Sequence, residues 1–191
     1  MAMINKTKRN PNYYKDIKTF GKCGEDDFLL YYKNRLLKEE YQLYDVRKIT
    51  EYQYVDIDFI ITKENKQDLP PIESVLKDKT YIKIEVKYNT KAMKTGYITY
   101  ELSSQGSTGW AINTQCDFIY QVFGEEDSLN IINRAWIDMN KWHDYVKSRD
   151  RMDTKDNYCF NKENNDRFFD LLCNMKDMEN KGIIKFINII N

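Results

Sequence analysis

Acidic and basic side chains alternate with apolar residues in two segments of the chain, at 54–61 and 81–87. Asp56 and Asp58 lie in the first segment, and Glu85 and Lys87 lie in the second. A β-strand points successive side chains to opposite faces, so alternation with a period of two predicts a strand. We therefore expect two strands, each with one apolar face and one charged face.

The charged faces hold the residue types that a metal-dependent hydrolase needs. If the strands are neighbours, the carboxylates of Asp58 and Glu85 reach one divalent cation, and two carboxylates with a backbone carbonyl suit Mg²⁺. Lys87 lies about 7 Å along the strand from Glu85 at roughly 3.4 Å per residue, close enough to orient or deprotonate a metal-bound water. The simpler alternative is that these charges face solvent or form a structural ion network.

Residues 21–123, which include these two segments, are similar to the PD-(D/E)xK (restriction-endonuclease-like) nuclease superfamily, and in particular to phage-borne members. The signature of that family is an acidic residue on one hairpin strand and an E-x-K triplet on the next, here Asp58 and Glu85-Val86-Lys87. Only this triplet lies in an alternating segment that follows another segment with aspartates. The same pattern occurs without that context at Asp16/Lys18, Glu64/Lys66, Asp153/Lys155 and Glu179/Lys181.

The resemblance implies a function and a set of site residues. We expect a nuclease that hydrolyses DNA with Mg²⁺, for which Mn²⁺ substitutes; RNA is left open as a substrate. Asp58, Glu85 and the carbonyl of Val86 are the implied metal ligands. Lys87 is implied to position the attacking water. The alternative is a catalytically inactive nuclease-like module that binds nucleic acid or protein.

Three further acidic residues belong to this hypothesis. Asp56 shares the predicted face of Asp58 and is its alternative, although resembling sequences place the acid directly before an apolar run, as Asp58 is. Glu25 opens a predicted helix, where many members of the superfamily carry a glutamate that contacts the metal or its waters. Glu101 is implied to assist, because phage-borne relatives share a loose run of similar residues. That run is here Glu85 to Lys87, Thr95-Gly96, Glu101 and Gly109-Trp110. For Glu25 and Glu101 the alternative is an ordinary surface carboxylate.

The predicted fold is α/β, with a restriction-endonuclease-like mixed central β-sheet flanked by helices and a helical C-terminal appendage. A length of 191 residues suits one domain. We place its core at about 21–137 and the appendage at about 138–191. Helices are expected at 25–37, 73–76, 110–116, 138–147 and 168–182, and strands at 42–49, 54–63, 81–87, 97–103, 117–123, 129–137 and 183–190. The strand at 97–103 is expected to extend the sheet beside the site.

The amino-acid composition bears on possible partners, metal sites and localisation. The formal net charge is zero, so a DNA partner is neither required nor excluded, although four lysines cluster near the triplet: Lys83, Lys87, Lys91 and Lys94. The four cysteines lack a C-x-x-C spacing and His143 is the single histidine, which argues against a zinc site. His143 is interpreted as a surface or packing residue rather than a catalytic one. Trp110 is interpreted as a core residue, and stacking on a base is its alternative. The sequence contains no apolar run of the roughly 20 residues that span a bilayer, so we expect a cytoplasmic protein without a membrane partner. A homodimer is left open.

Overall fold

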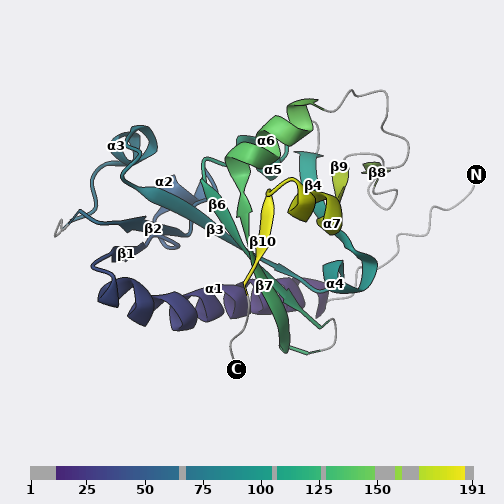
Figure 1. Ribbon diagram of the computed structural model, residues 1–191, viewed down its shortest axis with the longest axis horizontal. Coiled ribbons are helices and arrows are strands. Elements are labelled where there is room, and N and C mark those ends of the chain that lie inside the picture. Colours follow the sequence, from purple (N-terminus) through teal and green to yellow (C-terminus); the bar gives the residue numbers. More distant parts are fainter. Residues whose placement is uncertain are drawn as a thin grey trace, which may run out of the picture.

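Two β-sheets organise the chain in the computed structural model, which describes residues 12–64, 68–104, 107–125, 128–148, 158–160 and 168–187. The larger sheet has six strands in the order β1-β2-β3-β6-β7-β10, and the smaller has four in the order β5-β4-β9-β8 (Figure 1). The strands are β1 (Gln42–Asp45), β2 (Phe59–Thr62), β3 (Ile82–Asn89), β4 (Tyr97–Ser104), β5 (Ser107–Thr108), β6 (Phe118–Gly124), β7 (Ile131–Asp138), β8 (Tyr158–Phe160), β9 (Phe168–Asn174) and β10 (Ile184–Phe186). The helices are α1 (Asn12–Lys38), α2 (Thr50–Gln53), α3 (Ile72–Lys77), α4 (Ala92–Thr95), α5 (Trp110–Asn113), α6 (Met139–Ser148) and α7 (Met175–Asn180).

The six-stranded sheet is mixed. Its only parallel pair among the described strands is β3 with β6, and the other neighbours are antiparallel. A parallel pair requires the chain to cross back to the same end of the sheet. Here the crossover from β3 to β6 contains α4, β4, β5 and α5, so part of the second sheet is built inside it. The protein is therefore α/β with a mixed central sheet flanked by helices.

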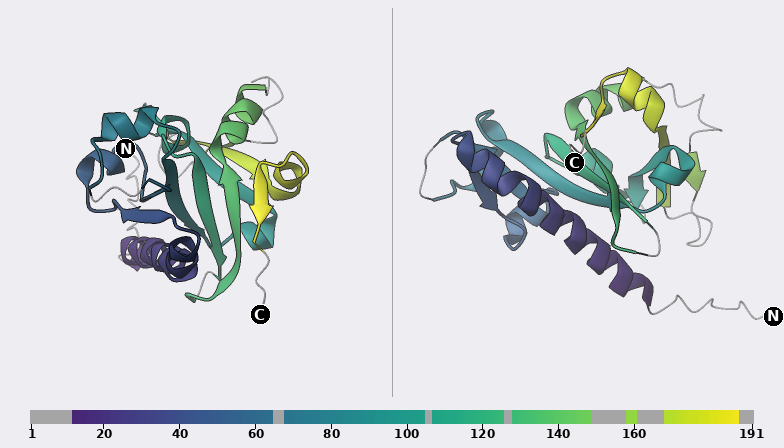
Figure 2. Two further views of the ribbon diagram at one scale, coloured as in Figure 1. Left: turned by 60° about the vertical axis from the view of Figure 1, so that its left-hand side comes forward. Right: turned by 60° about the horizontal axis from the view of Figure 1, so that its bottom comes forward.

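The long helix α1 covers one face of the central sheet (Figure 2). Its residues Phe28 and Leu36 pack with apolar side chains of β2, β3 and β6, including Ile84 and Val86. A buried ion pair fixes the helix to β7, because Arg134 donates to the Asp27 carboxylate at 2.7 and 2.6 Å. The helix begins earlier than the 25–37 that periodicity predicted, but it presents the predicted apolar side to the sheet.

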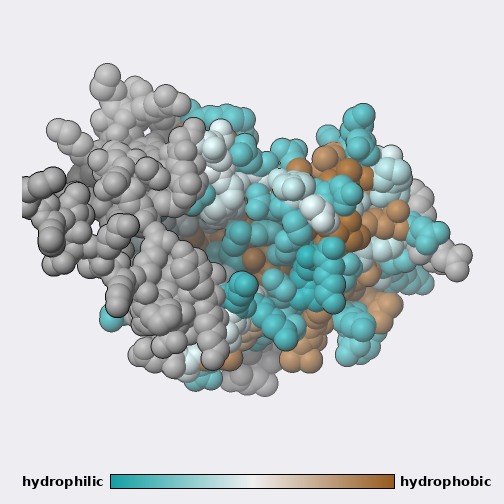
Figure 3. Space-filling view, turned by 180° about the vertical axis from the view of Figure 1, so that it is seen from behind, coloured by the Kyte–Doolittle hydropathy of each residue, from teal (hydrophilic) through white to brown (hydrophobic). Residues whose placement is uncertain are grey.

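The opposite face of the central sheet is covered by α5, α6 and the smaller sheet. Trp142 of α6 is fully buried and its ring lies 4.7 Å from that of Tyr100 in β4. Seen from behind, the described surface is mainly hydrophilic and carries only smaller apolar patches (Figure 3). No described helix combines the length and apolar character that a membrane crossing needs.

Three element predictions were wrong. Residues 54–56 form a turn rather than the start of a strand, and β2 begins only at Phe59. Strand β4 does not extend the central sheet but pairs with β9 in the smaller one. The predicted helix at 168–182 is strand β9 followed by the short helix α7, so the C-terminal region is helical only in part. The final strand, expected at 183–190, is confirmed at 184–186 as β10, which joins the central sheet beside β7; residues 188–190 lie outside the described part of the chain.

Candidate functional site

Asp58 and Glu85 lie opposite each other on neighbouring antiparallel segments. Strand β2 pairs with β3 through Phe59 and Ile84, so Asp58, one residue earlier, stands across from Glu85. The Asp58 N–H donates to the Ile84 carbonyl at 2.8 Å, and its Oδ2 accepts the Val86 N–H at 2.9 Å. These two bonds fix the Asp58 carboxylate against the β3 backbone beside Glu85.

The carbonyl of Val86 faces the same edge as this carboxylate. The N–H and C=O of one strand residue point to the same neighbour, and the Val86 N–H points to Asp58. The described pairing of β2 with β3 ends at Phe59 and Ile84, two residues before Val86. Beyond that point the Asp58 carboxylate, rather than a strand backbone, accepts the Val86 N–H. The Val86 carbonyl points toward the acidic residues.

Glu85 is buried in the interior rather than on a solvated strand face. Its side chain is 9% exposed and forms an ion pair with the Lys87 ammonium. Burial raises the pKa of Glu85 to about 8; Lys87 opposes this rise and Asp58 adds to it. The charged face of β3 is therefore covered by the second layer of the protein, contrary to the simple expectation of a strand with one face in solvent.

Lys87 is held between a carboxylate and an aromatic ring. Its Nζ atom lies 4.4 Å from the ring centroid of Trp110 while it pairs with Glu85. Burial disfavours its ammonium, but the surrounding carboxylates, with Glu85 foremost, outweigh burial and raise the pKa of Lys87. Lys87 is therefore protonated at neutral pH, which suits orienting a water or a phosphate better than removing a proton.

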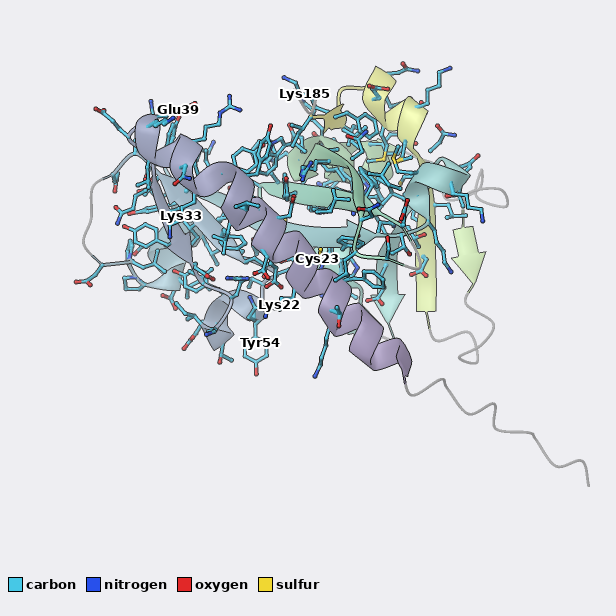
Figure 4. The ribbon with its side chains drawn as sticks, turned by 90° about the horizontal axis from the view of Figure 1, so that it is seen from below. Lys22, Cys23, Lys33, Glu39, Tyr54 and Lys185 are labelled. Carbon is cyan, nitrogen blue, oxygen red and sulfur yellow. The ribbon has the colours of Figure 1, made fainter. Side chains whose placement is uncertain are left out.

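Asp56 lies near the same charges but in a different conformation from the one predicted. It sits in a turn with a left-handed φ of +53°, a conformation that aspartate tolerates better than most residues. Burial raises its pKa, Lys87 opposes the rise and Asp58 adds to it, so all three groups interact. Tyr54 in the same turn is 82% exposed and projects outward, which places the turn at the protein surface (Figure 4).

Glu25 approaches the site from α1 but is bound to an arginine. Arg47 Nη1 donates to Glu25 Oε2 at 2.7 Å, and the same guanidinium pairs with Asp45 at 2.6 Å. Burial raises the pKa of Glu25, Arg47 opposes this, and the charge of Asp58 adds to it. The structure thus places Glu25 within electrostatic reach of Asp58, with its carboxylate engaged by Arg47.

Glu101 reaches the site from the second sheet. Its carboxylate lies near the main-chain N–H of Trp110, and its charge interacts with Lys87 and Asp56. Burial raises its pKa. His143 on α6 contacts α5, with Nε2 3.0 Å from the Ala111 carbonyl, which agrees with a packing role.

Two glutamines near the site were not anticipated. Gln53 Nε2 donates to Asp58 Oδ1 at 3.4 Å, and Gln121 Nε2 donates to the Lys87 carbonyl at 3.1 Å. Gln121 faces Lys87 because it is its register partner in the parallel β3–β6 pair. No local sequence pattern reveals that pairing, since the two strands are separated by the whole crossover.

The donor set suits a cation that keeps most of its water. Two carboxylates and one carbonyl come together at Asp58, Glu85 and Val86, and Mg²⁺ is held by one or two carboxylates while retaining several waters. The described residues contain no group of three or more histidine, cysteine, aspartate or glutamate side chains arranged to hold a metal ion. Asp58, Glu85 and the Val86 carbonyl are the groups that could hold such an ion.

Comparisons with known protein families, with curated proteins and with solved structures found no match to this chain.

Proposed function

We propose that the chain is a divalent-metal-dependent nuclease with a restriction-endonuclease-like fold, which hydrolyses phosphodiester bonds in DNA. The observation that carries the proposal is the placement of Asp58 directly across from Glu85, with Lys87 bound to Glu85 on the same strand face. An acidic residue beside an E-x-K strand is the signature from which the resemblance started. The mixed central sheet flanked by helices agrees with this fold class.

Each residue has a distinct role in the proposed reaction. Asp58 and Glu85, with the Val86 carbonyl, hold Mg²⁺ or Mn²⁺. The bound ion supplies a hydroxide-like water near neutral pH and neutralises charge on the phosphate. The Lys87 ammonium orients that water or a phosphate oxygen. The Glu101 and Asp56 carboxylates lie close enough to interact with the positive charge of Lys87.

The ion pair between Glu85 and Lys87 favours a second candidate. It satisfies both groups without a metal, as a module that binds nucleic acid or protein without cleaving it requires. The two candidates differ in whether a cation competes with Lys87 for the Glu85 carboxylate.

Cleavage assays and metal titration separate them. The purified protein is incubated with supercoiled, linear and branched DNA and with RNA, with Mg²⁺, Mn²⁺ or chelator, beside Glu85→Ala and Lys87→Ala. We expect divalent-dependent cleavage that both substitutions abolish. Glu73→Ala and Lys77→Ala, exposed positions on α3, are matched controls that retain activity.

Thermal unfolding with increasing Mg²⁺ measures metal binding independently of cleavage, because a ligand that binds only the folded state raises the stability of that state. A shift in the wild type that Glu85→Ala removes, together with cleavage, supports the nuclease. The absence of both a shift and cleavage of any substrate favours the inactive module. Cleavage that survives Glu85→Ala would contradict the assigned metal ligands.

A further inference from the structure

The Lys87 ammonium is confined on two sides. The Glu85 carboxylate pairs with it along β3, and the Trp110 ring lies 4.4 Å from Nζ on the other side. A tryptophan face attracts a cation more strongly than other aromatic rings do, and the attraction grows where water is excluded. Trp110 therefore holds Lys87 with a directional contact in addition to covering it.

The second sheet, and not the central one, sets the position of the Trp110 ring. The Gly109 N–H donates to the Leu102 carbonyl at 2.8 Å, and the Glu101 carboxylate lies near the main-chain N–H of Trp110. The ring itself lies 5.8 Å from that of Tyr100 in β4. Three consecutive residues of β4 thus determine where the indole meets Lys87.

Gly109 allows this approach because it has no side chain. A Cβ atom added there would lie 2.3 Å from the Glu101 carbonyl oxygen, a backbone atom that cannot rotate away. Any larger residue at this position must push α5 away from β4. The glycine is therefore required for the contact between Trp110 and Lys87.

The residues after α5 hold the acidic turn. Thr114 Oγ1 donates to the Asp56 carbonyl at 3.4 Å, and the Gln115 N–H donates to the Val55 carbonyl at 3.0 Å. One short segment, 109–115, thus fixes both the ring over Lys87 and the turn beside Asp58.

We propose that Trp110 is the positioning residue of the site: its indole face, placed by Gly109 and β4, holds the Lys87 ammonium in the orientation that the hydrolytic step uses. This inference rests on the proposed nuclease function. A lysine side chain has four rotatable bonds, so a group that removes its freedom before the substrate arrives raises the rate of the step that needs it. Trp110 acts through Lys87 and does not itself contact the reacting atoms.

The experiment compares two substitutions of the ring and two of glycine. Trp110→Phe keeps an aromatic face, whereas Trp110→Leu keeps only apolar bulk. We expect Trp110→Leu to lower kcat for divalent-dependent DNA cleavage by about 3- to 30-fold, the factor that a cation–π contact represents, with KM unchanged, and Trp110→Phe to recover most of the loss. Gly109→Ala should lower kcat likewise, whereas Gly21→Ala, with open space around its Cβ, should not.

A second readout does not depend on nuclease activity. The metal-free variants are treated with an amine-acylating reagent, and modification of Lys87 is measured by mass spectrometry relative to the exposed Lys77. We expect faster modification of Lys87 in Trp110→Leu and Gly109→Ala than in the wild type or Trp110→Phe. Equal modification in all four would overturn the inference even if DNA is cleaved. If the wild type cleaves nothing, the nuclease proposal fails, while the modification rates still decide whether Trp110 holds Lys87.

Discussion

Replacing Arg134 by methionine should be among the most destabilising single changes in this chain. Arg134 donates to Asp27 from Nε at 2.7 Å and from Nη2 at 2.6 Å, and the Tyr120 hydroxyl donates to the same carboxylate at 2.9 Å. The side chains of Arg134 and Asp27 are only 15% and 7% exposed. Arg134→Met therefore leaves a buried carboxylate with a hydroxyl donor but without a counter-charge.

The expected loss follows from that burial. Removing one partner of a buried ion pair costs about 3–5 kcal/mol, because the remaining charge cannot regain its water. For a chain of this length, such a loss lowers the unfolding midpoint by roughly 6–20 °C. Since Asp27 lies on α1, the change should also loosen the helix that carries Glu25.

Urea unfolding at neutral pH measures the effect, with Arg35→Met as the matched control. Arg35 pairs with Glu39 on the exposed side of α1, where the side chains are 63% and 54% accessible, so its loss should cost no more than about 1 kcal/mol. Adding Asp27→Asn to Arg134→Met should recover part of the stability by removing the stranded charge. A cost for Arg134→Met as small as that of Arg35→Met would refute the reasoning.

Two further predictions concern stability. The pKa of Glu85 in the folded protein, about 8, lies above its ordinary value of 4.5, so the folded state binds a proton more tightly than the unfolded chain. In chelator, the free energy of unfolding should therefore fall as pH rises from about 5 to about 8, by up to about 1.4 kcal/mol per pH unit. Urea unfolding of Glu85→Gln across the same pH range should lack this decrease. Parallel plots of unfolding free energy against pH for the two proteins would contradict the prediction. Gly96→Ala should cost about 1–2 kcal/mol because Gly96 has φ +78° at the end of α4, whereas Gly21→Ala in α1 should be neutral or slightly stabilising in the same measurement.

The sequence predicted strand β3 well, because every residue of it follows the period of two. Ile84 and Val86 pack against α1, while Glu85 and Lys87 face the other way. What alternation could not show is that the charged face is covered. Burial of Lys83 depends on Asp117, whose carboxylate pairs with the Lys83 ammonium at 2.8 Å although it lies 34 residues further along the chain.

The misassigned elements share a physical cause. Residues 54–58 alternate like a strand, yet the left-handed φ of Asp56 turns the chain before β2 begins. Phe168, Phe169 and Leu172 have helical spacing, but Leu171 and Cys173 are buried with a period of two because β9 pairs with β4. In both cases a tertiary contact accompanies the departure from the local pattern: the Gln115 N–H donates to the Val55 carbonyl beside the turn, and β4 pairs with β9. Such contacts cannot be inferred from a short window of sequence.

The pairing of β4 with β9 has a consequence for how the protein is made. A ribosome releases the segments that carry Asp58 and Glu85 long before it releases β9, whose register with β4 joins Tyr97 to Asn174. Until then β4, which supports Trp110 and Glu101, lacks its main neighbour, since β5 is only two residues long. On the proposed function, hydrolytic competence is therefore acquired only once β9 has been synthesised, and a chain truncated before β9 is poorly equipped to cut nucleic acid.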